Sequence, residues 1–385
     1  MKPLSFLVVA GESSGDMYGA DVALALKGRF PGCRIFGLGG QRMRQAGVRL
    51  EGDIRHTAAM GPLAAIGQLG SLFKVFRRLV DCIETAPPDV AILIDFPDFN
   101  LRLAKRIKAA KIPVIYYISP QVWAWRAGRV NQIRDVVTKM LVIFPFEEEI
   151  YRNAGVDVEF VGHPLIETVR ASKSKEEFCF SHGLDAKKPL FAILPGSRRK
   201  EIRHILPTLC EAVERIRAQK PDVQFVLPAA PNLDRGLIEG IVGSRPIKIV
   251  TNDTYNALRY ARAAIVASGT ATLETALLGT PEVIVYRLSS VEAWFLEKFF
   301  LKVRLFGIVN IILGEEVAPE LFQDRFTPEL VSQAAIKLMD DVWLQSKIRN
   351  KYETLRRQLS GGRVPDRVAA AVAEAINPER LQTKG

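Results

Sequence analysis

The chain has 385 residues, of which 48% are hydrophobic and 25% charged. This length suggests two or three domains, and the composition is that of a soluble globular protein, which excludes disordered and fibrous classes. The formal net charge is +11, but no basic tail and no nucleic-acid-binding pattern accompanies it, which disfavours nucleic acid as a partner. The excess charge then serves an anionic lipid surface, a phosphorylated substrate, or solubility alone.

Cysteine usage and the apolar segments narrow the class further. The cysteines at positions 33, 82, 179 and 210 lack the spacing of a zinc site or a disulfide framework, which indicates a reducing compartment. The N-terminal apolar run leads into a glycine-rich turn without a cleavage site, so it is a first strand rather than a signal peptide. Glycines and a proline interrupt the longest stretch without Lys, Arg, Asp or Glu, His56–Phe73, so it is not a membrane span.

Short apolar runs alternate with helical patterns from end to end. In the first half the expected strands are Leu4–Ala10, Arg34–Leu38, Asp89–Ile94, Pro113–Ile118, Met140–Phe144 and Val158–Val161. In the second half they are Leu190–Leu194, Gln224–Leu227, Ile247–Val250, Ala264–Ala267 and Val283–Tyr286. The run Val90–Ile94 has no polar alternation, which is typical of a strand buried on both faces of a parallel sheet. The fold class is therefore α/β, with two doubly wound Rossmann-like domains and a cleft between them.

The boundary between the two strand sets lies after His163 and Pro164, and the charged stretch Ala171–Glu177 separates them. His163 itself is interpreted as a packing histidine of the hinge region rather than as a base. The part from Thr327 onward is expected to be helical, with a last amphipathic helix over Arg367–Ile376.

Ligands of such sheets bind beyond the carboxyl ends of the strands, where four loops stand out. The first, Gly11–Asp16, belongs to a glycine series at positions 11, 15 and 19 that does not match the dinucleotide-binding pattern. It is either a tight turn with exposed amides or a loop that faces a substrate.

The second loop, Asp95–Asn100, follows the fully apolar strand. Pro97 is expected to stop this strand and to place Asp98 at the rim of the sheet. A carboxylate there, between two phenylalanines, has the setting for a raised pKa and for a role as general base. The alternative is an N-cap, provided by Asp98 or Asn100, for a helix that starts near Leu101.

The third loop, Leu194–Glu201, opens a helix directly after a strand. Its backbone amides and the guanidinium of Arg198 suit a phosphate, because a helix start attracts anions and arginine binds phosphate oxygens in pairs. Ordinary surface charge is the alternative.

The fourth loop, Ala267–Glu274, places small and hydroxylated residues at a helix start, namely Ser268, Gly269 and Thr270. This pattern predicts a phosphate cradle. Glu274, one turn further on, either accepts two hydrogen bonds from a ribose diol or lies on the helix surface. Two anion sites in one domain favour a nucleoside diphosphate.

The segment Leu63–Ile83 spreads its apolar residues over about half of a helix circumference, which is wider than core packing requires. These residues are Ile66, Leu69, Leu72, Phe73, Val75, Phe76, Leu79, Val80 and Ile83, and Lys74, Arg77 and Arg78 flank them. The helix either rests on an anionic membrane surface or packs deeply between layers. Trp123 and Trp125 similarly suit either stacking on a sugar or filling a corner of the core.

Six motifs occur together in chain order. They are AGESSGD (10–16), IDFPDFN (94–100), ISPQVWAWR (118–126), FVGHP (160–164), LPGSR (194–198) and ASGTATLE (267–274). The set closely resembles the lipid A disaccharide synthase family, whose members are glycosyltransferases of the GT-B fold. Each motif is weak alone, but the set is specific and covers nearly the whole chain.

The resemblance implies that UDP-2,3-diacylglucosamine is joined to 2,3-diacylglucosamine 1-phosphate, with inversion, to give the β-1,6-linked disaccharide phosphate and UDP. It implies roles for Arg198 and the 268–270 loop on the pyrophosphate, for Glu274 on the ribose, and for Asp98 as base. The loop with Glu12, Ser14, Gly15 and Asp16 would face the acceptor. Asn310 matches a family asparagine, although the local sequence departs from the usual Leu-Pro-Asn.

The same resemblance implies an acceptor and membrane-side domain over 1–165, a nucleotide-sugar-binding domain over 166–350, and C-terminal helices over 351–385 that return to the first domain. Leu72, Phe73, Phe76 and Arg77 would face the membrane, because both substrates carry acyl chains. No cofactor or metal is expected, and the location would be cytoplasmic, peripheral to the inner membrane. The sequence leaves a homodimer open.

Two other functions remain open at this stage. One is a different GT-B enzyme that uses UDP-N-acetylglucosamine, either for transfer to an undecaprenyl acceptor or for 2-epimerisation. The other is a non-catalytic protein that binds a nucleotide sugar or a lipid.

Overall fold

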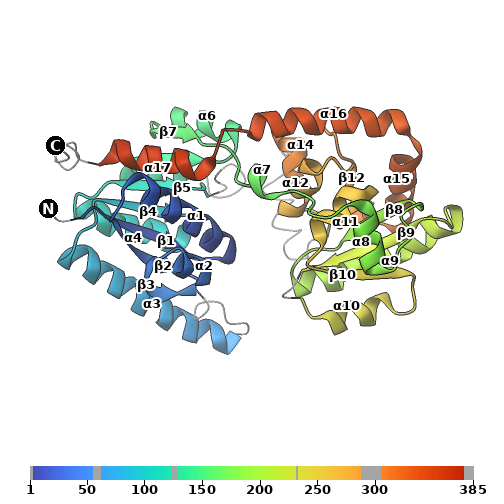
Figure 1. Ribbon diagram of the computed structural model, residues 1–385, viewed down its shortest axis with the longest axis horizontal. Helices are drawn as coiled ribbons and strands as arrows, with labels where there is room; N and C mark the ends of the chain where they lie inside the picture. The colour runs from blue at the N-terminus through green and yellow to red at the C-terminus, as the bar shows by residue number, and fades with distance from the viewer. Residues whose placement is uncertain are drawn as a thin grey trace. The chain divides into compact units, whose positions relative to one another are not determined.

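The computed structural model describes residues 3–54, 62–120, 122, 128–230, 233–287 and 305–376, with the backbone alone for 62–69. The chain divides into two compact units (Figure 1). Unit 1 comprises residues 1–164 together with 359–385, and unit 2 comprises residues 165–358. The second unit is therefore inserted into the sequence of the first.

Unit 1 is built on a seven-stranded parallel sheet with the order β3-β2-β1-β4-β5-β6-β7. The strands are β1 (Ser5–Ala10), β2 (Arg34–Gly39), β3 (Arg49–Asp53), β4 (Val90–Ile94), β5 (Val114–Tyr117), β6 (Lys139–Val142) and β7 (Val158–Phe160). Every residue of β4 is fully buried, as its uninterrupted apolar run predicts. The two adjacent strands β1 and β4 therefore lie at the centre of the hydrophobic core of unit 1.

Helices join consecutive strands of unit 1. They are α1 (Ser13–Arg29), α2 (Gln41–Gln45), α3 (Pro62–Thr85), α4 (Pro97–Ala109), α5 (Arg129–Val136) and α6 (Pro145–Asn153). The C-terminal helix α17 (Val364–Ala375) packs on α1, so helices from the first and the last part of the sequence lie side by side in unit 1 (Figure 1). The apolar side of α17 consists of Val364, Val368, Ala369, Ala371 and Val372, all of which are buried.

The return of the chain to unit 1 depends on a close backbone contact. A Cβ at Gly361 would lie 2.8 Å from the Cα of Gly162, which is too near for any side chain. Beside this contact, the amide of His163 donates to the carbonyl of Leu359 at 2.9 Å. The segment that leaves unit 1 and the segment that re-enters it are thus bonded to each other.

Unit 2 repeats the architecture with a six-stranded parallel sheet, in the order β10-β9-β8-β11-β12-β13. The strands are β8 (Leu190–Leu194), β9 (Gln224–Ala229), β10 (Ile247–Thr251), β11 (Ala261–Ala267), β12 (Glu282–Tyr286) and β13 (Glu320–Phe322). The helices are α7 (Leu165–Thr168), α8 (Lys175–His182), α9 (Arg199–Gln219), α10 (Arg235–Val242), α11 (Thr254–Tyr260), α12 (Thr270–Leu277), α14 (Ile308–Leu313), α15 (Pro328–Asp340) and α16 (Val342–Leu359).

The α/β prediction with two doubly wound sheets is confirmed, and each expected strand is present with ends shifted by a few residues at most. The structure adds two edge strands, β3 and β13, that the sequence analysis missed. In both sheets the chain order reverses at the centre, between β1 and β4 in unit 1 and between β8 and β11 in unit 2. Such a switch point leaves a crevice at the carboxyl ends of the two strands, which is where ligands of this architecture bind.

Candidate functional site

The turn after β1 lies at the switch point of unit 1. A Cβ at Gly11 would lie 2.2 Å from the ring of Phe96, so this glycine is needed for the close approach of the turn after β4. Gly15 is buried in the first turn of α1. Glu12 is the exposed N-cap residue of that helix. Ser14, two residues later, is exposed as well.

Asp16 has a different environment from that expected of a residue that faces a substrate. Its carboxylate is 6% exposed and accepts backbone N–H groups from Gly40 at 2.6 Å, Arg42 at 3.0 Å and Met43 at 3.1 Å. These amides belong to the start of α2, which has no capping side chain of its own. Asp16 therefore acts as a remote cap that joins α1 to α2.

The turn after β4 has an unusual backbone. Asp95 and Phe96 both adopt the left-handed region, with φ of 46° and 48°. The hydroxyl of Tyr116 donates to the carbonyl of Asp95 at 2.7 Å, and Nδ2 of Asn100 donates to the same carbonyl at 2.7 Å. Left-handed residues other than glycine persist only where surrounding contacts hold them, and they cluster at functional sites.

Helix α4 starts at Pro97 and not near Leu101, so the expected helix start is wrong. Proline suits the first helical position because its missing N–H would have no partner there. The N-cap residue is Phe96, and no side chain caps the helix. The capping role considered for Asp98 or Asn100 is thus also wrong, and Asn100 instead stabilises the turn that precedes the helix.

Asp98 lies in the first turn of α4 with a side chain that is 75% exposed, and it forms an ion pair with Arg129 of α5. The apolar enclosure expected for Asp98 is therefore wrong. The two neighbouring phenylalanines, Phe96 and Phe99, stack on each other with ring centroids 5.4 Å apart. The role of Asp98 as base stays a prediction.

The enclosed carboxylate of this turn is that of Asp95. Its pKa is raised to about 6, chiefly by burial and to a smaller extent by the negative charge of Glu12. A carboxyl group with such a pKa exchanges a proton near neutral pH. The raised pKa that the sequence analysis assigned to Asp98 thus belongs to the residue three positions earlier.

His163 is 4% exposed, with its ring centroid 5.2 Å from that of Phe144. Burial lowers its pKa to about 3, so the imidazole is neutral at physiological pH. These observations confirm the interpretation as a packing histidine. The other aromatic candidates, Trp123 and Trp125, lie outside the described residues.

Helix α3 divides its apolar residues between two environments. Leu72 and Phe76 pack against the core of unit 1, and the ring of Phe76 meets that of Phe99 edge to face at 5.6 Å. Phe73 is 60% exposed, and the guanidinium of Arg77 lies 5.5 Å from its ring centroid. The side chains of Ile66 and Leu69 lie outside the described residues.

The turn after β8 forms a cradle of donors at the switch point of unit 2. The amides of Ser197 and Arg198 donate to Oε2 of Glu201 at 2.8 and 3.1 Å, and Nη1 of Arg198 donates to Oε1 at 3.0 Å. Gly196, with φ of 110°, allows this carboxylate to approach, since a Cβ there would lie 2.4 Å from Oε2. In this structure a carboxylate of the chain itself accepts the donors of this turn. Their binding to a phosphate stays a prediction.

The turn after β11 lies on the other side of the same switch point. The amide of Ser268 donates to the carbonyl of Val285, while Gly269 and Thr270 are exposed at the start of α12. The amides of a first helical turn have no acceptor within the helix, so this end can receive an anion.

Glu274 lies one turn into α12, and its Oε1 accepts a hydrogen bond of 2.7 Å from the hydroxyl of Tyr255 on α11. Burial raises the pKa of Glu274, and the hydrogen bond from Tyr255 lowers it in partial compensation. Glu274 is thus not a plain helix-surface residue. It is a half-buried carboxylate with a defined partner.

Asn310 is fully buried, and its amide is engaged within its own loop. Nδ2 donates to the carbonyl of Ala318 at 2.8 Å and to Oε1 of Glu320 at 2.7 Å, and Oδ1 accepts the amides of Val317 and Ala318 at 2.9 Å each. The amide therefore orders the connection between α14 and β13. Its contact with a nucleotide sugar stays a prediction.

Comparison with known proteins identifies the family. Residues 6–375 match the sequence model of the lipid-A-disaccharide synthetase family. The chain belongs to this family. The lipid-A-disaccharide synthase of Koribacter versatilis (strain Ellin345) is 41% identical over 377 residues, which cover 97% of this chain and 98% of that protein. The synthase of Syntrophus aciditrophicus (strain SB) is 40% identical over 373 residues, which cover 96% and 97%.

Solved structures show the same fold at low identity. The UDP-GlcNAc 2-epimerase of Neisseria meningitidis, bound to UDP-GlcNAc, has a TM-score of 0.67 at 12% identity and covers 96% of this chain and 100% of its own. The glycotransferase of kitacinnamycin has a TM-score of 0.66 at 15% identity and covers 98% and 100%. These likenesses confirm the GT-B architecture, whereas the family membership decides the activity.

The chain is therefore a hexosyltransferase of lipid A biosynthesis, and the epimerase and binding-protein alternatives are set aside. Within the described part of the chain, no helix is long and apolar enough to cross a membrane. Among the same residues, no group of three or more His, Cys, Asp and Glu side chains is arranged to hold a metal ion.

Sequence reasoning missed three residues of the candidate site. Asp95 was identified only as the start of a loop, although it is the first residue beyond the buried strand. Glu201 follows the helix-start residue Arg198 by three positions, which is the spacing of a capping box and the signal that would have found it. Tyr255 gave no signal, because only the packing of α11 on α12 brings it to Glu274.

The raised pKa of Asp95 makes the stability of unit 1 depend on pH. Because the folded protein holds the proton more tightly than the unfolded chain, charging Asp95 costs stability as pH rises from about 4 to above about 6. Asp95→Asn lacks this cost. The free energy of unfolding of Asp95→Asn minus that of the wild type should therefore be larger at pH 7.5 than at pH 4, by about 1–2 kcal/mol. Denaturant unfolding at both pH values measures the difference.

Glu12→Gln serves as the control for this effect. Removing the charge of Glu12 lowers the pKa of Asp95, so the pH-dependent part of the Asp95→Asn difference should shrink in the Glu12→Gln background. A constant offset at all pH values would show that Asp95 titrates normally.

Proposed function

We propose that the chain transfers a 2,3-diacylglucosamine unit from its UDP derivative to the 6-hydroxyl of 2,3-diacylglucosamine 1-phosphate, with inversion at the anomeric carbon. The observation that carries this proposal is the family match over residues 6–375, in a fold that places polar loops at both switch points. The new bond forms between the acceptor oxygen and the anomeric carbon, the bond to the diphosphate breaks, and UDP leaves. The acceptor proton passes to a carboxylate.

The donor diphosphate is proposed to bind in unit 2, at the turns after β8 and β11. Arg198, the hydroxyls of Ser268 and Thr270, and the amide of Gly269 would stabilise the negative charge that develops on the leaving group. Glu274 would accept the two ribose hydroxyls. These donors would supply the charge stabilisation that departure of UDP needs.

Glu201 gives this binding step a specific form. Its carboxylate holds three donors of the cradle and is 19% exposed, whereas the side chain of Arg198 is 81% exposed. A phosphate that takes these donors must draw them from Glu201, so we expect binding to exchange one anion for another. This exchange keeps the amides of Ser197 and Arg198 paired both before and after UDP binds.

The acceptor is proposed to bind at the switch point of unit 1, beside Glu12, Ser14 and Asp98. Asp98 would accept the proton of the attacking hydroxyl, because its exposed carboxylate is accessible to a substrate and the ion pair with Arg129 holds it in position. Asp16 and Gly15 would shape the turn rather than touch the acceptor, since both are buried.

The membrane contact is proposed to involve α3, at the cytoplasmic surface of the inner membrane. Phe73, Lys74, Arg77 and Arg78 are exposed on this helix. An aromatic side chain among cations suits the interface of an anionic bilayer, where the ring enters the headgroup region and the cations remain outside. Acylated substrates would then be taken from the same surface.

The ribose assignment predicts the effect of Glu274→Ala on UDP affinity. The change should weaken binding by about 1–3 kcal/mol, because two hydrogen bonds to a charged group are lost. Glu239→Ala on α10, which removes an exposed glutamate, is the matched control and should bind UDP as the wild type does. Calorimetry with UDP measures both, and unchanged affinity of Glu274→Ala would refute the assignment.

The base assignment predicts the effect of Asp98→Asn on turnover. The variant keeps the size of the side chain but removes the acceptor of the proton, so the rate should fall by at least about 100-fold. UDP affinity and the melting temperature should stay near wild-type values. Asp135→Asn on α5 is the control, since this carboxylate is also exposed. Turnover within a few-fold of wild type would transfer the role to Asp95.

The membrane assignment predicts that Phe73→Ser binds vesicles less well. Withdrawing one aromatic side chain from the bilayer interface should lower the partition coefficient by roughly ten-fold. Phe180→Ser on α8 is the control, because Phe180 is the more exposed ring at 89%. Sedimentation with vesicles that contain anionic phospholipid distinguishes the two, and equal losses would show that the contact lies elsewhere.

A further inference from the structure

The carboxylate proposed to receive the ribose has a partner that the family match does not account for. The hydroxyl of Tyr255 donates to Oε1 of Glu274 at 2.7 Å, from the first turn of α11 to the first turns of α12. We propose that Tyr255 is a positioning residue, which sets the orientation of the Glu274 carboxylate so that it can accept both ribose hydroxyls. This inference rests on the proposed function of Glu274.

The geometry leaves enough acceptor capacity for a diol. An ionised carboxylate has about four lone-pair positions, and the hydroxyl of Tyr255 takes one of them. The remaining positions on Oε1 and Oε2 can each receive a ribose hydroxyl. Because a hydroxyl bonded to Oε1 restricts rotation of the carboxylate, the two acceptors are fixed before the nucleotide arrives, which lowers the entropy cost of binding.

Burial makes the partner necessary. Glu274 is half-buried, and burial raises its pKa, while the hydrogen bond from Tyr255 opposes this effect. A protonated carboxyl group would donate where a ribose hydroxyl also donates. The hydroxyl of Tyr255 therefore supports the ionised state that two donating ribose hydroxyls require.

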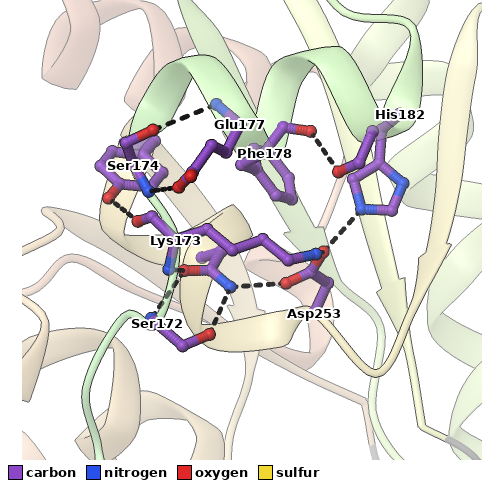
Figure 2. A network of polar contacts seen from close by, with 10 residues as sticks. Ser172, Lys173, Ser174, Glu177, Phe178, His182 and Asp253 are labelled. Carbon is purple, nitrogen blue, oxygen red and sulfur yellow. Dashed lines mark hydrogen bonds and ion pairs between the residues drawn. The ribbon is translucent and has the colours of Figure 1, made fainter.

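The helix that carries Tyr255 is itself firmly held. Asp253 immediately precedes α11, and its Oδ2 lies 2.6 Å from Nζ of Lys173 and 2.7 Å from Nε2 of His182 (Figure 2). Oδ1 of Asn256, next to Tyr255, accepts the amides of Ser172 and Lys173 at 2.9 and 3.0 Å. The network thus bonds the first turn of α11 to the segment that precedes α8.

The last turn of α11 is bonded to that segment as well, because the hydroxyl of Tyr260 donates to the carbonyl of Lys173. The bonds of Asp253 and Asn256, on either side of Tyr255, do not involve Tyr260, so they hold Tyr255 in place toward Glu274 even where Tyr260 lacks its hydroxyl. Tyr260 also provides a matched control, since it is a second tyrosine of the same helix, and its hydroxyl bonds the carbonyl of Lys173 instead of Glu274.

The test compares Tyr255→Phe and Tyr260→Phe with the wild type by calorimetry, using UDP and 2′,3′-dideoxy-UDP as probes. Tyr255→Phe should weaken UDP binding by about ten-fold, because the ribose loses a pre-oriented acceptor pair. Affinity for the dideoxy probe, which has no diol, should equal that of the wild type. Tyr260→Phe should keep the wild-type ratio between the two probes.

A double-mutant cycle with Glu274→Ala supplies the second measurement. In the Glu274→Ala background, Tyr255→Phe should have no further effect on UDP affinity, since the carboxylate through which it acts is gone. Melting temperatures of the variants identify any general loss of structure.

Three outcomes would overturn the inference. Wild-type UDP affinity in Tyr255→Phe would show that the hydroxyl positions nothing. Equal losses for UDP and the dideoxy probe, or an undiminished effect in the Glu274→Ala background, would assign Tyr255 a structural role. If Glu274→Ala alone left UDP affinity unchanged, the ribose assignment itself would fail, and this failure is distinct from one confined to Tyr255.

Discussion

Parallel pairing of β1 with β4 and of β8 with β11 is the constraint on which the candidate site depends. Because the chain order reverses at these pairs, the connecting helices turn to opposite sides and the carboxyl ends stay uncovered. Each uncovered edge exposes backbone amides and short polar side chains from two separate turns. In unit 1 these turns carry Glu12 and Asp95, and in unit 2 they carry Arg198 and Gly269. The rest of each unit serves to hold these turns in place.

The structure stabilises these turns with polar groups of its own. Asn100 and Tyr116 donate hydrogen bonds to the carbonyl of Asp95, which has a left-handed backbone. The Asp16 carboxylate caps α2, and the Glu201 carboxylate accepts hydrogen bonds from the turn after β8. In each case a buried or half-buried polar atom is paired within the chain, since an unpaired one would cost about 1–3 kcal/mol. A substrate therefore meets a site whose geometry is already set, and at Glu201 it replaces a bond that exists rather than creating order where there was none.

Much of this could be predicted from the sequence, because uninterrupted apolar runs such as Val90–Ile94 have one stable location, the centre of a parallel sheet. The edge strands β3 and β13 were missed, since Arg49–Asp53 and Glu320–Phe322 are short and partly polar, and their pairing depends on a neighbour that is already in place. The confusion of Asp98 with Asp95 has a similar cause. A left-handed backbone at an aspartate and a phenylalanine goes against local preference and is imposed by Tyr116 and Asn100, which no local pattern reveals.

The insertion of unit 2 into unit 1 has a consequence for synthesis. The sheet of unit 1 leaves the ribosome first, but the helix α17 that covers α1 follows only after all of residues 165–358. Unit 2 is continuous, so it has every strand and helix it needs before unit 1 is complete. Until α17 docks and Gly361 meets Gly162, apolar surface of α1 faces solvent, which is the kind of surface that attracts chaperones or other nascent chains. The half of the molecule that is made first is thus the half that is finished last.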